Sequence, residues 1–181
     1  MLKQKKSFCS ALLTKKGSIM DFTKNTGIAM KELTEHGAFF SVSGKNGINT
    51  MVISWGFIGM IWNKPCFIAL VRPQRHTKKM LDGADSFTVS IPFGVDMKKE
   101  LLVCGSKSGA DIDKSKTVEF VKAKTVSSPL VKGCSVFYEC RLLFSQPIDG
   151  KFMPADICGK FYKEKDFHII YVGEIVENGE V

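Results

Sequence analysis

The stretch PCFIALVRPQRHTKK, from Pro65 to Lys79, joins an apolar run to a dense group of basic and hydrogen-bonding residues. The segment CFIALVR is apolar on both faces, which is typical of a central strand of a sheet or barrel. Two arginines, one histidine, one threonine and two lysines then fall within nine residues. A solvated surface loop needs no such supply of donors, whereas a site for a compact anion such as phosphate does. The stretch therefore predicts a buried strand that ends at an anion site.

A short helix is predicted just after this strand, from about Thr77 to Asp82, with Gly83 at its exit. Thr77 is a suitable N-cap, so the backbone N–H groups of His76, Thr77 and Lys78 would be free at the helix start. The helix dipole adds positive potential at such a terminus, which favours an anion there.

Two arginines, Arg72 and Arg75, lie beside this helix start in the sequence. Their forked guanidinium donors suit the oxygens of a phosphate group. An alternative interpretation is that both arginines form surface salt bridges and that Thr77 only caps a helix. Spacing alone leaves these two interpretations open.

Alternating and apolar patterns on both sides of this stretch predict six strands. A glycine-rich turn at residues 44–47, GKNG, has the residues that a hairpin between the first two strands requires. A second short helix is predicted from about Asp96 to Cys104, with Gly105 as its C-terminal stop. The six strands are AFFSVSG, NTMVISW, CFIALVR, SFTVSIP, CSVFYECRLLFSQ and DFHIIYVGEIVE.

Strands outnumber helices and do not alternate regularly with them, which favours a small closed β-barrel with peripheral helices over a doubly wound α/β sheet. The chain has 181 residues, of which 44% are hydrophobic, so one domain can bury a substantial core. We interpret residues 1–20 as a flexible basic extension rather than a signal peptide, and residues 21–181 as a single domain.

The net charge of +8 permits nucleic-acid binding, but no aromatic-basic module or helix-turn-helix pattern accompanies it. No apolar run reaches the roughly 18 residues that a membrane span requires. The cysteines form no C-x-x-C pair and no zinc pattern, and the three histidines have no metal-site spacing, so we expect reduced thiols, no metal and a cytoplasmic protein. The cysteines are residues 9, 66, 104, 134, 140 and 158.

A second polar stretch, CGSKSGADIDK at residues 104–114, supports the anion site. Gly105 and Gly109 allow tight turns, and Ser106, Lys107 and Ser108 supply donors between them. The stretch is neither a Walker A loop nor a nucleophile elbow. The alternative interpretation is a helix C-terminus followed by a solvated loop.

Four motifs together, NTMVISWG, VRPQRHT, CGSKSGADIDK and DFHIIYVGEI, resemble the flavin reductase-like, FMN-binding split-barrel family that includes flavoredoxin. The resemblance covers roughly residues 36–176. It implies a six-stranded split barrel, a homodimer, and FMN near the subunit interface.

The resemblance also implies site residues. The segment Asn49–Ser54 would run along the isoalloxazine ring, Arg72–Thr77 would hold the phosphate, and Ser106–Asp113 would close over the ribityl-phosphate side. His168 resembles a residue near the nicotinamide and flavin, although a histidine packed at a barrel mouth is an equal alternative. The implied cofactor-binding residues are Asn49, Thr50, Met51, Val52, Ile53, Ser54, Arg72, Gln74, Arg75, His76, Thr77, Ser106, Lys107, Ser108 and Asp113.

The chain departs from the family pattern at four positions. Gln74 and His76 stand within the usual R-P-S-R-Y-T sequence, Ala110 replaces a common arginine, and Val52 replaces a frequent threonine. Gln74 can still donate to phosphate, and Ala110 removes one cationic contact. Trp55 and Trp62 could line the flavin, but strand aromatics more often pack in the core.

The resemblance predicts an NAD(P)H-dependent flavin reductase that transfers hydride from NADH or NADPH to flavin. The alternative is a non-catalytic flavoredoxin-like electron carrier, which a redox partner protein would reduce. A weaker alternative, from another class, is a basic nucleic-acid-binding barrel without a cofactor. Because a bound flavin would carry the electron chemistry, the absence of a nucleophile–base dyad from the sequence fits either flavin protein.

Overall fold

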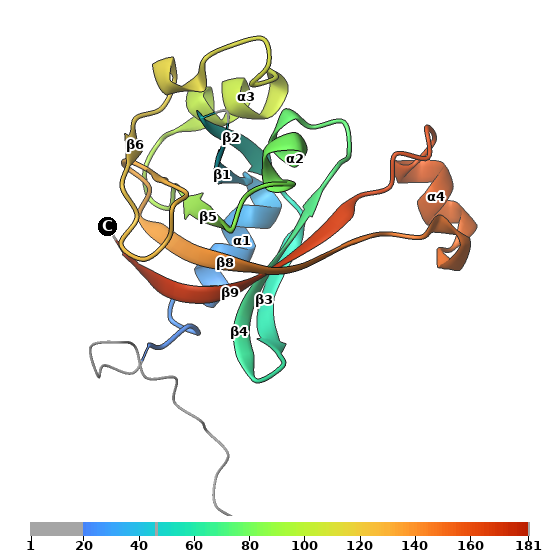
Figure 1. The fold of residues 1–181 in the computed structure, drawn as a ribbon, viewed down its shortest axis with the longest axis horizontal. Helices are drawn as coiled ribbons and strands as arrows, with labels where there is room; N and C mark the ends of the chain where they lie inside the picture. Colours follow the sequence, from blue (N-terminus) through green and yellow to red (C-terminus); the bar gives the residue numbers. More distant parts are fainter. Residues whose placement is uncertain (1–19, 46, 181) are drawn as a thin grey trace, which may run out of the picture.

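A computed structural model describes residues 20–45 and 47–180 (Figure 1). The first 19 residues of the predicted extension lie outside the described residues. A seven-stranded antiparallel sheet, in the order β2-β1-β5-β8-β9-β4-β3, dominates the fold, and β6 pairs with β7 beside it. The strands are β1 (Ala38–Gly44), β2 (Gly47–Ile53), β3 (Gly56–Ile61), β4 (Lys64–Val71), β5 (Ser86–Ile91), β6 (Phe120–Val121), β7 (Leu130–Val131), β8 (Val136–Pro147) and β9 (Ile169–Glu180).

Short helices lie in the connections between strands, except for α1, which precedes β1. Two of them, α1 and α4, were not predicted, and α1 buries Ala29 and Leu33 in the core. The helices are α1 (Thr26–Glu35), α2 (His76–Leu81), α3 (Lys98–Ser106) and α4 (Ala155–Phe161), with 3₁₀ turns η1 (Lys114–Lys116) and η2 (Gly150–Phe152). None of the helices within residues 20–45 and 47–180 is long and apolar enough to cross a membrane.

The mainly β fold with short peripheral helices is confirmed, but the main sheet has one strand more than predicted. The missed strand is β3, a glycine-containing edge strand whose side chains are largely exposed or half-buried. A tight turn at Trp62 and Asn63, both with positive φ, joins β3 to β4. Trp62 at this turn is 63% exposed and Trp55 is 38% exposed, so of the two alternatives for these residues the favoured one, packing in the core, is wrong.

Strand β5 is buried on both faces. Its sequence alternates apolar and hydroxyl residues, yet all six residues are buried, because residues 127–131 cover the hydroxyl face. The Thr88 hydroxyl donates to the carbonyl of Pro129, and the Ser90 hydroxyl accepts from the backbone N–H of Val131. Short polar side chains can be buried here since each finds a partner.

The core lies on both faces of the sheet. The barrel interior contains Phe40 and Phe87, whose ring centroids are 4.8 Å apart. The adjacent residue, Phe39, points to the other face, where it packs with Leu101 and Cys104 of α3. This second cluster fixes α3 against β2, which positions the loop that follows the helix.

The longest strands, β8 and β9, carry an arm that we define as residues 148–168. It contains η2 and α4 and connects the end of β8 to the start of β9. In Figure 1, α4 lies at the far end of these two strands, well away from α1 and α3. The base of the arm returns to the barrel at the end of β4, where the basic stretch of the sequence begins.

Candidate functional site

A cavity of about 130 Å³ lies where β2, the start of α2 and the end of α3 meet. Most of its lining comes from the three segments that the sequence analysis selected. The lining residues are Asn49, Met51, Gln74, Arg75, His76, Thr77, Cys104, Ser106, Lys107, Ser108, Gly109 and Lys114. Of these, Cys104, Gly109 and Lys114 were not among the predicted site residues.

A buried hydrogen bond joins two walls of the pocket. The Asn49 amide donates to the Thr77 hydroxyl at 2.8 Å, and both residues are at least 97% buried. The prediction that Thr77 is the N-cap of α2 is therefore wrong. The helix begins at His76, and Arg75 is its N-cap. The prediction failed because Asn49 of a distant strand engages the hydroxyl. The third wall closes at Gly109, where an added Cβ would lie 2.1 Å from Asn49 Oδ1.

A buried lysine, Lys114, forms the floor of the pocket. The residue is only 5% exposed, and its Nζ donates to the carbonyls of Thr50 and Cys104 at 2.8 and 2.7 Å. Burial lowers the pKa of this ammonium group from its ordinary value. No local pattern distinguishes Lys114 from a surface lysine after a loop, which explains why the sequence analysis missed it.

The predicted stop of α3 at Gly105 is also wrong, and the difference shapes the pocket. The helix continues to Ser106, whose hydroxyl donates to the Leu102 carbonyl at 2.7 Å. Gly105 lies inside the last turn, where a Cβ would approach Val52 to 3.3 Å. The helix is two residues longer at this end than predicted, and Ser106, Lys107 and Ser108 at and just beyond its end line the pocket.

The pocket is cationic. Arg75 and Lys107 are exposed at its rim, and among the described residues neither forms a salt bridge. Arg75 reaches the Gly105 carbonyl at 3.5 Å, so it spans from the α2 wall to the α3 wall. Two cations beside hydroxyl and amide donors are the chemistry that recognises phosphate.

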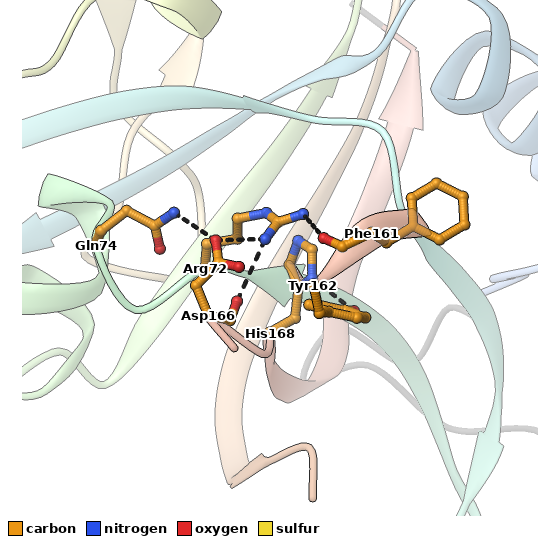
Figure 2. Close-up of polar contacts among 6 residues, drawn as sticks. All are labelled: Arg72, Gln74, Phe161, Tyr162, Asp166 and His168. Carbon is orange, nitrogen blue, oxygen red and sulfur yellow. Dashed lines mark hydrogen bonds and ion pairs between the residues drawn. The ribbon is translucent and has the colours of Figure 1, made fainter. Parts of the chain in front are cut away.

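The other predicted arginine, Arg72, does not line this pocket. Figure 2 shows its guanidinium turned toward the base of the arm, where it pairs with the Asp166 carboxylate and donates to the Phe161 carbonyl at 2.9 Å. Gln74 does reach the pocket wall, but its amide donates to Asp166 at 2.8 Å. These bonds hold the pKa of Asp166 below its ordinary value.

The predicted catalytic residue, His168, also lies outside the pocket, in an aromatic cluster. It is 7% exposed, hydrogen-bonds through Nδ1 to the Tyr162 hydroxyl at 2.9 Å, and packs against the Trp55 ring at 4.9 Å. Burial, with help from the charges of Arg72 and Arg75, lowers the pKa of His168 to about 4. The imidazole is therefore neutral near pH 7.

The remaining predicted residues have structural positions. The Thr50 carbonyl accepts from Lys114, Ile53 is a core residue, and Val52 packs half-buried against the α3 cluster. Asp113 caps η1 by accepting from the backbone N–H of Ser115 at 3.0 Å. None of the four lines the pocket, and neither does Ser54, which is exposed just beyond β2.

The free thiols and acidic groups form no metal centre within the described part of the chain. Cys104 touches the pocket, and burial raises the pKa of its thiol. The described cysteines are unpaired, and all but Cys158 are buried.

Comparison with known structures defines the class. The chain superposes on flavoredoxin from Methanosarcina acetivorans with a TM-score of 0.63 at 22% identity, covering 78% of this chain and 66% of that one. It superposes on an FMN-binding protein from Thermus thermophilus with bound 1-cyclohex-2-enone with a TM-score of 0.62 at 25% identity, covering 80% of this chain and 69% of that one. A protein from Shewanella frigidimarina, described as a flavin reductase with a split-barrel domain, matches with a TM-score of 0.61 at 14% identity, covering 93% of this chain and 79% of that one. The fold is a split barrel of this class.

The family follows from the sequence itself. Residues 33–180 match the flavin reductase like domain, which is most of the chain. The protein belongs to the flavin reductase-like domain family. It spans about two thirds of the length of the flavoredoxin with which it superposes.

Proposed function

We propose that the chain binds FMN, with the phosphate end of the cofactor in the cationic pocket, and that it is an NAD(P)H-dependent flavin reductase. The observation that carries the proposal is the convergence of Arg75, His76 and Lys107 on one cavity inside the region that matches the family. The Thermus protein, at 25% identity, is described as FMN-binding, which supports the same cofactor.

The size of the pocket fits part of the cofactor. Sites that enclose a whole drug-sized ligand measure roughly 300–1,000 Å³, whereas this cavity measures about 130 Å³. A phosphate and the neighbouring ribityl carbons fit that volume, and the ring system would remain outside the cavity. An open ring face is what hydride transfer from a nicotinamide requires.

A bound flavin would supply the hydride and electron chemistry, and the chain would supply binding and electrostatics. Arg75 and Lys107 would neutralise the phosphate charge. The buried ammonium of Lys114 adds positive potential at the floor, where low polarity strengthens its effect. His168 is neutral near pH 7, so we assign it a contact through its ring rather than proton donation.

The test compares FMN with riboflavin, which lacks the phosphate. We expect Arg75→Ala combined with Lys107→Ala to weaken FMN binding by about tenfold or more and riboflavin binding by less than about twofold. Binding is measured by quenching of the flavin fluorescence. If the wild-type protein binds neither flavin, the proposed cofactor is wrong.

Anaerobic reduction separates the two flavin functions. NADH or NADPH should bleach the visible absorption of the protein–FMN complex if the chain is a reductase. If FMN binds but neither nicotinamide bleaches it, the reductase proposal is wrong and a flavoredoxin-like carrier, reduced by a partner protein, takes its place. Dithionite serves as the control that the bound flavin is reducible.

We also propose that the chain is a homodimer. Large apolar side chains of the β3–β4 hairpin and β8 are about half exposed. The centroids of the Trp62 and Phe144 rings lie 6.2 Å apart. Such a surface is typical of a subunit contact. The exposed side chains are Phe57, Met60, Trp62 and Phe144. Sedimentation velocity should give the mass of two chains, and Trp62→Glu should shift it toward one.

A further inference from the structure

The guanidinium of Arg72 connects the barrel to the arm of residues 148–168. One nitrogen, NH1, pairs with the Asp166 carboxylate and donates to the Asp166 carbonyl at 3.3 Å; NH2 donates to the Phe161 carbonyl at 2.9 Å. The guanidinium also lies over the Tyr162 ring, 5.2 Å from its centroid. All of these partners belong to the arm, and both terminal nitrogens of the guanidinium donate to them (Figure 2).

Gln74 adds a second connection to the same carboxylate, at 2.8 Å. The Arg72 and Asp166 side chains are only 22% and 23% exposed, so water competes weakly for this pair. Withdrawing Arg72 to a phosphate would leave the Asp166 carboxylate with the Gln74 amide alone and would leave two arm carbonyls without their Arg72 donor. Leaving such groups unpaired is unfavourable.

Beyond the fastening point, the arm carries the aromatic cluster. Tyr162 follows Phe161 directly and hydrogen-bonds to His168, and His168 packs against Trp55 at the end of β2. The Trp55 ring also meets Phe161 edge-on at 5.2 Å. The Arg72 contacts therefore help to hold Phe161 and Tyr162 of the arm against Trp55 and His168.

We propose that Arg72 and Gln74 are positioning residues that fasten the arm through Asp166, and that Arg75 and Lys107, without Arg72, select the phosphorylated flavin. This inference rests on the proposed FMN site and divides its basic segment into two functions. The two arginines are separated by only two residues, yet one faces the arm and the other faces the pocket.

The first test is flavin selectivity, measured as the ratio of the FMN and riboflavin affinities. Arg75→Ala should lower this ratio by about tenfold, whereas Arg72→Ala and Asp166→Asn should each leave it within about twofold of the wild type. A loss of selectivity in Arg72→Ala as large as that in Arg75→Ala would overturn the assignment.

The second test is hydrogen–deuterium exchange of the arm, which needs no flavin. Arg72→Ala and Asp166→Asn should speed exchange in residues 148–168 and leave β5 unchanged, which also shows that the variants are folded. The reversed pair Arg72→Asp with Asp166→Arg should recover much of the protection. An aspartate at a true phosphate contact would instead abolish FMN selectivity.

A matched control reverses Lys132 and Glu119, an exposed pair at 2.8 Å outside the arm. This change should alter neither readout, because exposed pairs contribute little. Arm exchange that stays at the wild-type rate in both single variants would refute the fastening. If the wild-type protein binds neither flavin, the proposed function fails, but the exchange experiment still decides the role of Arg72.

Discussion

Lys114 and His168 show how burial changes what a titratable side chain can do. Lys114 keeps two carbonyl partners and serves as a brace between β2 and α3. Burial is the largest cause of the lowered pKa of His168. Lys114 thus places an ammonium group in the site, whereas His168 is neutral near pH 7.

The lowered pKa of His168 predicts a pH-dependent stability. Its pKa is about 4 in the folded chain and about 6.5 when unfolded, so between these values the unfolded chain binds the extra proton. The free energy of unfolding should therefore fall as the pH drops from about 6.5 toward 4. Urea unfolding should show a loss on the order of 1 to 2 kcal/mol between pH 6.5 and pH 5. His168→Gln should flatten this dependence; an unchanged slope would contradict the assignment.

The connections after β4 and after α3 build the pocket, and both depend on a close approach between segments. A Cβ at position 109 would overlap Asn49 Oδ1, so the loop after α3 reaches its place only with glycine. Gly109→Ala should displace the loop or break the Asn49–Thr77 bond, at a cost of about 1 to 3 kcal/mol. FMN affinity should fall with it, by about tenfold.

The matched control for this loop is Gly83→Ala, just after α2, where a Cβ would meet nothing within 4 Å. Urea unfolding and FMN titration of both variants form the measurement. Equal behaviour of the two variants would show that the approach of Gly109 to Asn49 is unimportant.

Across the whole sheet, β9 joins the two halves by pairing with β8 on one side and β4 on the other. At Gly173 it crosses the barrel interior so closely that a Cβ would lie 2.5 Å from the Phe87 ring and 2.8 Å from Cys140 Cβ. The pairing of β8 with β9 shifts register beside this point, between Leu142 and Phe144. A side chain at position 173 would therefore push β9 away from Phe87 of β5 and Cys140 of β8.

Gly173→Ala should destabilise the protein by about 1 to 3 kcal/mol, because β9 is paired with β8 and β4 and cannot move without them. Thermal or urea unfolding measures the loss. Gly159→Ala in α4, where no atom lies within 4 Å of the added Cβ, should be neutral or stabilise by less than about 1 kcal/mol. If Gly173→Ala leaves the free energy of unfolding unchanged, the inference that β9 has no room for a side chain at position 173 is wrong.

The amino-acid sequence by itself determined the barrel strands with strong periodicity, the hairpin at residues 44–47, and the three segments that meet at the pocket. These features are local, because alternation, turn glycines and clustered donors can be read within ten residues. The edge strand β3 and helix α1 have weaker local patterns, and neither was predicted.

Only the tertiary structure decided which side chains serve the pocket. Arg72 and Arg75 look equivalent in sequence, but Asp166, 94 residues beyond Arg72, turns the first toward the arm. Thr77 and Lys114 likewise take their roles from partners in β2. The physical reason is the same in each case: a polar side chain points to the partner that satisfies its hydrogen bonds, and long-range folding places that partner.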